Sequence, residues 1–183
     1  TISGCAIHQD LFLLMYDKKA IYLLYGVEVT IDDTEIYDTR YGLDAYSYRS
    51  SDMVVTVTNC SFHDITDWAV RTLASGTGYF GPDMMLNWNC FEDNGNWNLY
   101  VGSYKNAFVT TIDARNNWWG TTDTVEIASK IRDYSDNANC AHVDWTPFLN
   151  GCGGDVVSGN YVQGVIDTDT IWHAADSPFS VSY

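Results

Sequence analysis

The stretch Val57-Thr58-Asn59-Cys60-Ser61-Phe62 decides the fold, because its pattern returns along the chain. An apolar residue opens each copy, a small or amide residue stands fourth, and a large apolar residue closes it. The closing residues of the five copies are Ile7, Ile36, Phe62, Phe91 and Trp119, at spacings of 29, 26, 29 and 28 residues. Such a period indicates a repeat architecture, in which one unit cannot bury its apolar face alone.

Two further columns agree with this alignment. The opening residues are Ile2, Ile31, Val57, Leu86 and Ala114, and the small or amide residues are Cys5, Thr34, Cys60, Asn89 and Asn117. A second strand is predicted after each of three copies, at 43–46, 69–72 and 99–101, and extra residues fall in a loop at 73–83. The pattern predicts an all-β coil of parallel strands over residues 1–122, with about 4.8 Å between coils, so that like residues stack. An antiparallel sandwich, whose strands would not keep matched columns, is the alternative.

Composition limits the function classes. The chain has 183 residues, 9 Lys+Arg, 24 Asp+Glu and a net charge of −15, which argues against nucleic acid and anionic membranes as partners. The hydrophobic fraction of 46% is too high for a disordered chain. The longest apolar run, 11–16, is too short to span a bilayer. No signal segment opens the chain, so we expect a fragment of a larger secreted protein.

The five cysteines are Cys5, Cys60, Cys90, Cys140 and Cys152. An odd count leaves at least one unpaired within the chain, and no Cys/His spacing is typical of zinc. Cys140 and Cys152 flank one loop-rich stretch, which favours them as a pair. The alternative that all five are buried thiols stays open.

The segment 113–150 contains Asn116-Asn117-Trp118-Trp119-Gly120 and ends in a VDWTPFL sequence. It resembles the end of a right-handed parallel β-helix of the pectate-lyase-like superfamily, of the type found in secreted microbial surface proteins. The resemblance covers residues 1–150 and implies a right-handed β-helix of about five coils. A helix at 123–134, with Asp123 as its N-cap and an apolar face at 127, 131 and 134, is predicted to cover the open end of the coil.

The chain is predicted to divide into three parts. Residues 1–150 form the β-helix and its helical cap, 151–160 a Gly-rich linker, and 161–183 a strand-forming tail. The tail resembles the start of a further module. We also expect that its strands, at 161–166 and 179–183, can pair with the open first coil of another copy.

The resemblance brings polysaccharide lyases and hydrolases into consideration. A lyase would need acids for calcium and a basic residue beside them, and Asp44 with Arg71 is the pair that adjacent second strands offer. A hydrolase would use a cluster such as Asp38, Asp64 and Asp93, which share one column. A solvated turn is the favoured reading of that column. A catalytic site is therefore not predicted.

Two binding sites remain as candidates. The residues that could stack sugar rings are Trp68, Trp97 and Tyr100, and those that could bind Ca²⁺ are Asp93, Asn94 and Asn96. Packing under loops and a simple turn are the respective alternatives, and no cofactor is required by the sequence.

The sequence thus favours a structural or adhesive module of a secreted microbial surface or filament protein. Its partners would be copies of itself or adjacent modules of the same polypeptide, with polysaccharide as a further candidate and without a membrane span. The alternative is a polysaccharide lyase or hydrolase, or a sugar-binding remnant of one. Fold analogy alone is weak support for an activity.

Overall fold

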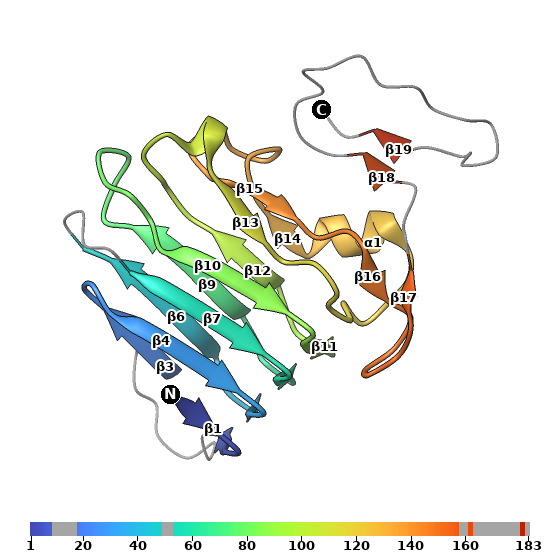
Figure 1. The fold of residues 1–183 in the computed structure, drawn as a ribbon. Coiled ribbons are helices and arrows are strands. Elements are labelled where there is room, and N and C mark those ends of the chain that lie inside the picture. Colours follow the sequence, from blue (N-terminus) through green and yellow to red (C-terminus); the bar gives the residue numbers. More distant parts are fainter. Residues whose placement is uncertain (9–17, 49–52, 158–160, 163–179, 182–183) are drawn as a thin grey trace.

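The computed structural model describes residues 1–8, 18–48, 53–157, 161–162 and 180–181. The chain forms an all-β solenoid in which parallel strands stack into three sheets (Figure 1). Four turns are complete, each with one strand in every sheet, and a fifth turn is partial. The predicted parallel fold is confirmed, with about four turns in place of about five, and the antiparallel sandwich is excluded.

The three sheets are named here A, B and C. Sheet A has the order β1 (Ile2–Ser3), β4 (Glu28–Asp32), β7 (Val54–Thr58), β10 (Asp83–Asn87), β13 (Thr111–Asp113) and β15 (His142–Asp144). Sheet B contains β2 (Ala6–His8), β5 (Glu35–Tyr37), β8 (Ser61–His63) and β11 (Cys90–Glu92). Sheet C contains β3 (Lys19–Leu24), β6 (Tyr41–Ser47), β9 (Trp68–Ala74), β12 (Trp97–Val101) and β14 (Ile131–Arg132). Outside these sheets lie η1 (Ala107–Val109), α1 (Thr124–Ser129), β16 (Phe148–Leu149), β17 (Val156–Val157), β18 (Tyr161–Val162) and β19 (Ser180–Val181).

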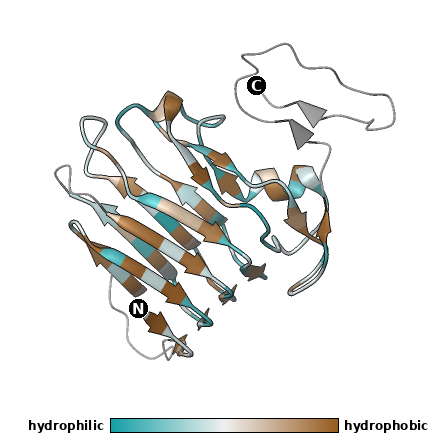
Figure 2. Cartoon of the chain, in the orientation of Figure 1, coloured by the Kyte–Doolittle hydropathy of each residue, from teal (hydrophilic) through white to brown (hydrophobic). Residues whose placement is uncertain are grey.

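The apolar columns of the sequence are the interior of the solenoid. Val57 pairs with Ile31 on one side and with Leu86 on the other, as the alignment predicted. In sheet B, the ring of Phe62 stacks on that of Phe91 with centroids 5.2 Å apart, and Phe91 stacks on Trp119 at 4.8 Å. The strands of sheet A alternate hydrophobic and hydrophilic residues (Figure 2), because one face meets this core and the other meets water.

Buried amides join successive turns between sheets A and B. The Asn89 side chain accepts from the backbone N–H of Cys60 at 2.9 Å and donates to the carbonyl of Val57 at 3.0 Å. The Asn117 side chain accepts from the backbone N–H of Asn89 at 2.8 Å and so repeats the motif one turn later. The stacked amides predicted from the sequence are confirmed. They satisfy backbone groups that the turn would otherwise leave buried and unpaired.

The predicted terminal helix is shorter than expected, and it does not end the solenoid. The Asp123 carboxylate caps α1 as predicted, accepting from the backbone N–H of Val125 at 2.9 Å. The helix stops at Ser129, and Ile131 pairs with Leu99 as part of β14. The prediction of a helix through 134 was therefore wrong. The i, i+4, i+7 pattern cannot distinguish a long helix from a short helix followed by a strand that faces the same core.

The disulfide joins Cys90 to Cys152, across 62 residues. The predicted pairing of Cys140 with Cys152 was wrong, and so was the alternative of five thiols. Cys140 is 1% exposed and packs in the core, where an Arg132 guanidinium nitrogen lies 3.1 Å from its sulfur. Nearness in sequence was misleading, because Cys90 begins β11, the last strand of sheet B. The segment that contains Cys152 packs at this end of the solenoid.

The segment after the solenoid is a hairpin. Strands β16 and β17 pair antiparallel, and residues 151–154 of the predicted linker form the turn between them. Figure 1 shows this hairpin together with α1 at the same end of the solenoid. The bond from Cys152 to Cys90 fastens the hairpin to the fourth turn.

Little of the predicted tail lies within the described residues. Strands β18 and β19 pair in parallel. The remaining positions of the predicted tail strands at 161–166 and 179–183 lie outside the described residues, so strand addition by the tail stays a prediction. None of the described helices is long and apolar enough to cross a membrane.

Candidate functional site

The outer surface of sheet C collects aromatic and basic side chains in two columns. The strand register places Lys19, Tyr41, Trp68 and Trp97 in one column and Tyr22, Asp44, Arg71, Tyr100 and Arg132 in the next. We call this set the aromatic–basic face. Each column runs along the solenoid axis because successive turns stack in parallel with about 4.8 Å between strands.

A buried carboxylate lies at the centre of the aromatic–basic face. Asp44 is 0% exposed, and it accepts from Arg71 Nε at 2.8 Å and Nη2 at 2.5 Å. The Lys19 ammonium lies 3.0 Å from the same carboxylate. A buried charge is tolerated only when it is paired, and here two cations compensate one anion. The contact between Asp44 and Arg71 considered from the sequence is present.

The electrostatics of this cluster do not suit a proton-abstracting base. Burial alone would lower the pKa of Arg71, but its hydrogen bonds and ion pair with Asp44 outweigh burial and raise that pKa. A base must lose its proton near the working pH, and this environment holds the guanidinium protonated. The cluster instead fixes the positions of the side chains around it.

The predicted sugar-stacking residues lie together on this face. Trp68 and Tyr100 have ring centroids 5.9 Å apart, and Trp97 and Tyr100 have centroids 6.1 Å apart. All three side chains are partly exposed. Guanidinium groups cover part of the platform, with Arg71 at 4.3 Å from the Trp68 ring and Arg132 at 4.6 Å from the Tyr100 ring. Such cation–π contacts hold the rings in place.

Sequence reasoning missed four members of the aromatic–basic face, Lys19, Tyr22, Tyr41 and Arg132. Tyr41 stacks on Trp68 with centroids 4.0 Å apart, and Lys19 and Arg132 extend the columns toward the two ends of the sheet. The signal was present in the sequence. Extending the repeat alignment from the first strand of each coil to the strands of sheet C would have placed these residues in columns.

The three residues predicted to bind Ca²⁺ differ in their exposure to solvent. Asp93 and Asn96 are exposed, whereas the buried Asn94 amide accepts from the backbone N–H of Ile65 at 3.1 Å. The Lys130 ammonium donates to the carbonyl of Asn94 at 3.1 Å and also to that of Gly95. The Lys130 ammonium therefore occupies two backbone carbonyl oxygens of this turn. In the described part of the chain, His, Cys, Asp and Glu form no group of three or more suited to a metal.

The aspartates considered for a hydrolase lie at exposed turns. Asp38, Asp64 and Asp93 all have left-handed backbone conformations, with φ of 51°, 54° and 49°. Asp is among the non-glycine residues that tolerate this region best, because its side chain bonds locally to the backbone. The repeated turn geometry thus accounts for this column.

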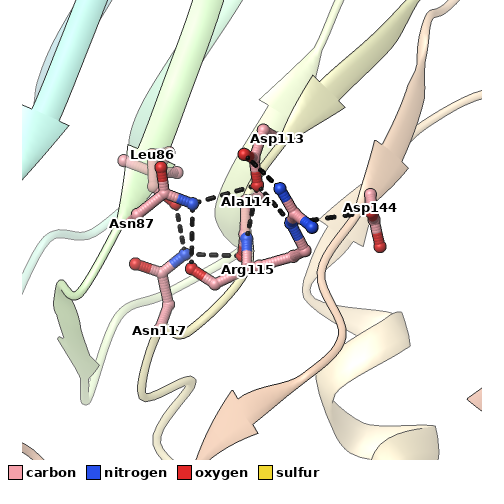
Figure 3. A network of polar contacts seen from close by, with 7 residues as sticks. All are labelled: Leu86, Asn87, Asp113, Ala114, Arg115, Asn117 and Asp144. Atoms are coloured by element: carbon pink, nitrogen blue, oxygen red, sulfur yellow. Dashed lines mark hydrogen bonds and ion pairs between the residues drawn. The ribbon is translucent and has the colours of Figure 1, made fainter.

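A second polar network lies on the outer side of sheet A, where the chain enters the turn at 116–120 (Figure 3). Arg115 holds the carboxylate of Asp113 with two hydrogen bonds, at 2.9 and 2.8 Å, and lies 3.8 Å from Asp144. Asn87 also donates to Asp113, at 3.0 Å. The Arg115 hydrogen bonds, supported by Asn87, lower the pKa of Asp113 to about 2.

This network is expected to contribute stability only where Asp113 is ionised. A carboxyl whose folded pKa is depressed stabilises the protein above its unfolded pKa, near 3.9, and loses that contribution as the pH falls through about 2. Arg115→Gln should therefore lower the free energy of unfolding at neutral pH, and the difference from wild type should shrink between about pH 4 and pH 2. Denaturant unfolding at a series of pH values measures it. Arg40→Gln, which removes a 3.7 Å ion pair with Asp67, is the control. A difference that stays constant with pH would contradict the prediction.

The fold and this face define the chain as a parallel β-solenoid. Comparison with known proteins adds one similarity: Protein bark beetle of Drosophila melanogaster is 38% identical over 58 residues. Those residues are 32% of this chain and 2% of the fly protein, so the chain spans a small part of that relative's length. No family model matches the chain, and no solved structure matches it.

Proposed function

We propose that this chain is a structural and adhesive module of a secreted surface or filament protein. The observation that carries the proposal is the aromatic–basic face, which a stack of parallel turns holds in fixed columns. The rings and cations of this face are positioned by the buried Asp44 cluster before any ligand arrives. Such preorganisation reduces the entropy that binding must overcome.

Two observations support placement in a longer extracellular protein. The bond between Cys90 and Cys152 belongs to a class of crosslink that persists mainly in oxidising compartments. The likeness to 58 residues of a fly protein concerns 2% of that protein, so a similar stretch occurs inside a far longer chain. The resemblance to microbial β-helices and this likeness to an insect protein together favour a module used by more than one group of organisms.

Polysaccharide is the ligand that the aromatic side chains favour. Trp68, Trp97 and Tyr100 have partly exposed rings, and the Tyr100 centroid lies 5.9 Å from that of Trp68 and 6.1 Å from that of Trp97. Aromatic rings pack on the apolar faces of sugars, and neighbouring guanidinium groups can donate to sugar oxygens. Binding without cleavage is the expectation, because Arg71 is held protonated by Asp44.

Trp97→Ala is expected to weaken retention on immobilised polysaccharides at least tenfold, which corresponds to about 1.4 kcal/mol of lost binding free energy. Affinity electrophoresis across a panel of neutral and acidic polysaccharides measures the retention. The matched control is Trp88→Ala, since Trp88 is 48% exposed and lies in a turn between sheets A and B. Equal loss in both variants, or no retention of wild type on any polysaccharide, would contradict sugar binding at this face.

The same preparations test the enzymatic alternative. Incubation of wild type with each retained polysaccharide and calcium should leave chain length unchanged and produce no unsaturated sugar ends. Turnover that disappears in Arg71→Ala would favour a lyase over an adhesive module.

A further inference from the structure

Charge is segregated between the sheets of the solenoid. Among the described residues, the strands of sheets A and B contain no Lys or Arg, and their acids are Glu28, Asp32, Glu35, Asp83, Glu92, Asp113 and Asp144. The strands of sheet C contain Lys19, Arg71 and Arg132, with Asp44 as their one acid. The residues directly before sheet C strands add Lys18, Arg40 and Lys130 against Asp67. A chain of net charge −15 therefore has one basic surface. It consists of the aromatic–basic face and these flanking residues, and we call it the basic wall.

The basic wall lies opposite the acidic outer face of sheet A, which we call the acidic wall. Sheets A and C enclose the apolar core between them (Figure 1), so their outer surfaces lie on opposite sides of the solenoid. On sheet A, Glu28 and Asp83 are exposed at the starts of β4 and β10, and Val54 lies between them in the same column. Arg115, beyond the end of β13, is the nearby cation on this side, and Asp113 and Asp144 already engage it.

We propose that the aromatic–basic face docks on the acidic outer face of sheet A of a second copy of this chain. The inference rests on the proposed structural role and names the partner that charge complementarity favours. Basic and acidic surfaces attract at contact and exclude like-charged pairings. The exposed Val54 and Met85, which are 39% and 46% exposed, give the acidic face apolar area to set against the rings.

The two faces also have the same spacing of side chains along the solenoid axis. Both are built from the same turns, so side chains on each recur at one strand spacing, about 4.8 Å. Two solenoids with parallel axes can then bring the cations of one copy opposite the carboxylates of the other. The contact joins two different surfaces, so it is heterologous, and translation-related copies would continue it into an open array rather than a closed dimer.

Salt should control this association. At about 0.1 M salt, charges farther apart than about 10 Å are screened, which weakens the repulsion between two chains of charge −15 while contact pairs persist. At 1 M salt the screening length is about 3 Å, so contact pairs weaken as well. Sedimentation velocity is expected to show concentration-dependent association of wild type at 0.1 M salt and monomers at 1 M.

Reciprocal charge substitutions test which faces meet. Lys18→Glu/Arg40→Glu cancels the net positive charge of the basic wall, and Glu28→Lys/Asp83→Lys cancels the net negative charge of the acidic wall. Each double variant alone should be monomeric at 0.1 M salt, with association at least tenfold weaker than in wild type. An equimolar mixture should associate again, because the unaltered acidic wall of the first variant then meets the unaltered basic wall of the second. The matched control is Glu126→Lys/Asp136→Lys, which alters exposed acids on α1 and after β14 and should associate like wild type.

Three results would overturn the inference: a monomeric wild type at 0.1 M salt, loss of association in the control variant, or a mixture that stays monomeric. A monomeric wild type that is retained on polygalacturonate would assign the basic wall to an acidic glycan instead. The polysaccharide assay with Trp97→Ala measures sugar binding by monomeric protein. The adhesive role is therefore tested separately from self-association.

Discussion

Replacing Phe91 by alanine is expected to destabilise the protein by about 3–5 kcal/mol. Phe91 is 0% exposed, and its ring is stacked between Phe62 at 5.2 Å and Trp119 at 4.8 Å. Removing the ring leaves a cavity between two turns that the fixed strand spacing cannot close. Because each turn contacts only its neighbours, the defect separates the first three turns from the end of the solenoid.

Chemical denaturation of the purified variant measures the loss in free energy of unfolding. Phe108→Ala is the matched control, since Phe108 is 64% exposed in η1 and its truncation should change stability by no more than about 0.5 kcal/mol. A loss for Phe91→Ala as small as that of the control would show that the aromatic stack does not couple the turns.

Replacing Cys152 by serine is expected to cost about 4 kcal/mol, from the chain entropy of a 62-residue crosslink. In the unfolded chain the crosslink keeps residues 90 and 152 together, which reduces the conformational entropy of that state. The free energy of unfolding of the variant and of wild type, each with and without reductant, measures the effect.

Reductant should lower the stability of wild type to that of Cys152→Ser and leave the variant unchanged. Cys5→Ser is the control, because Cys5 is an exposed free thiol and should behave like wild type in both conditions. A wild type that is insensitive to reductant would contradict a stabilising role for the bond. Peptide mapping without reduction checks the pairing directly.

The candidate site was predictable in part. The sequence predicted that Asp44 and Arg71 lie on adjacent strands, and it grouped Trp68 with Trp97 and Tyr100. Both predictions follow because a stacked repeat aligns residues about one period apart. It did not show that Asp44 is fully buried between two cations, since burial depends on how the neighbouring columns pack. The segregation of charge between sheets also required the assignment of every strand to its sheet.

The sequence by itself determined the parallel coil, its columns and their register. Ile31, Val57 and Leu86 meet because the period of the sequence is the period of the structure, and like residues must stack to bury one continuous core. The tertiary structure alone decided where the helix ends and which cysteine Cys152 reaches. Ile131 joins β14 and Cys152 reaches Cys90, since both positions depend on how the last segment packs against the solenoid, and no repeat in the sequence encodes that packing.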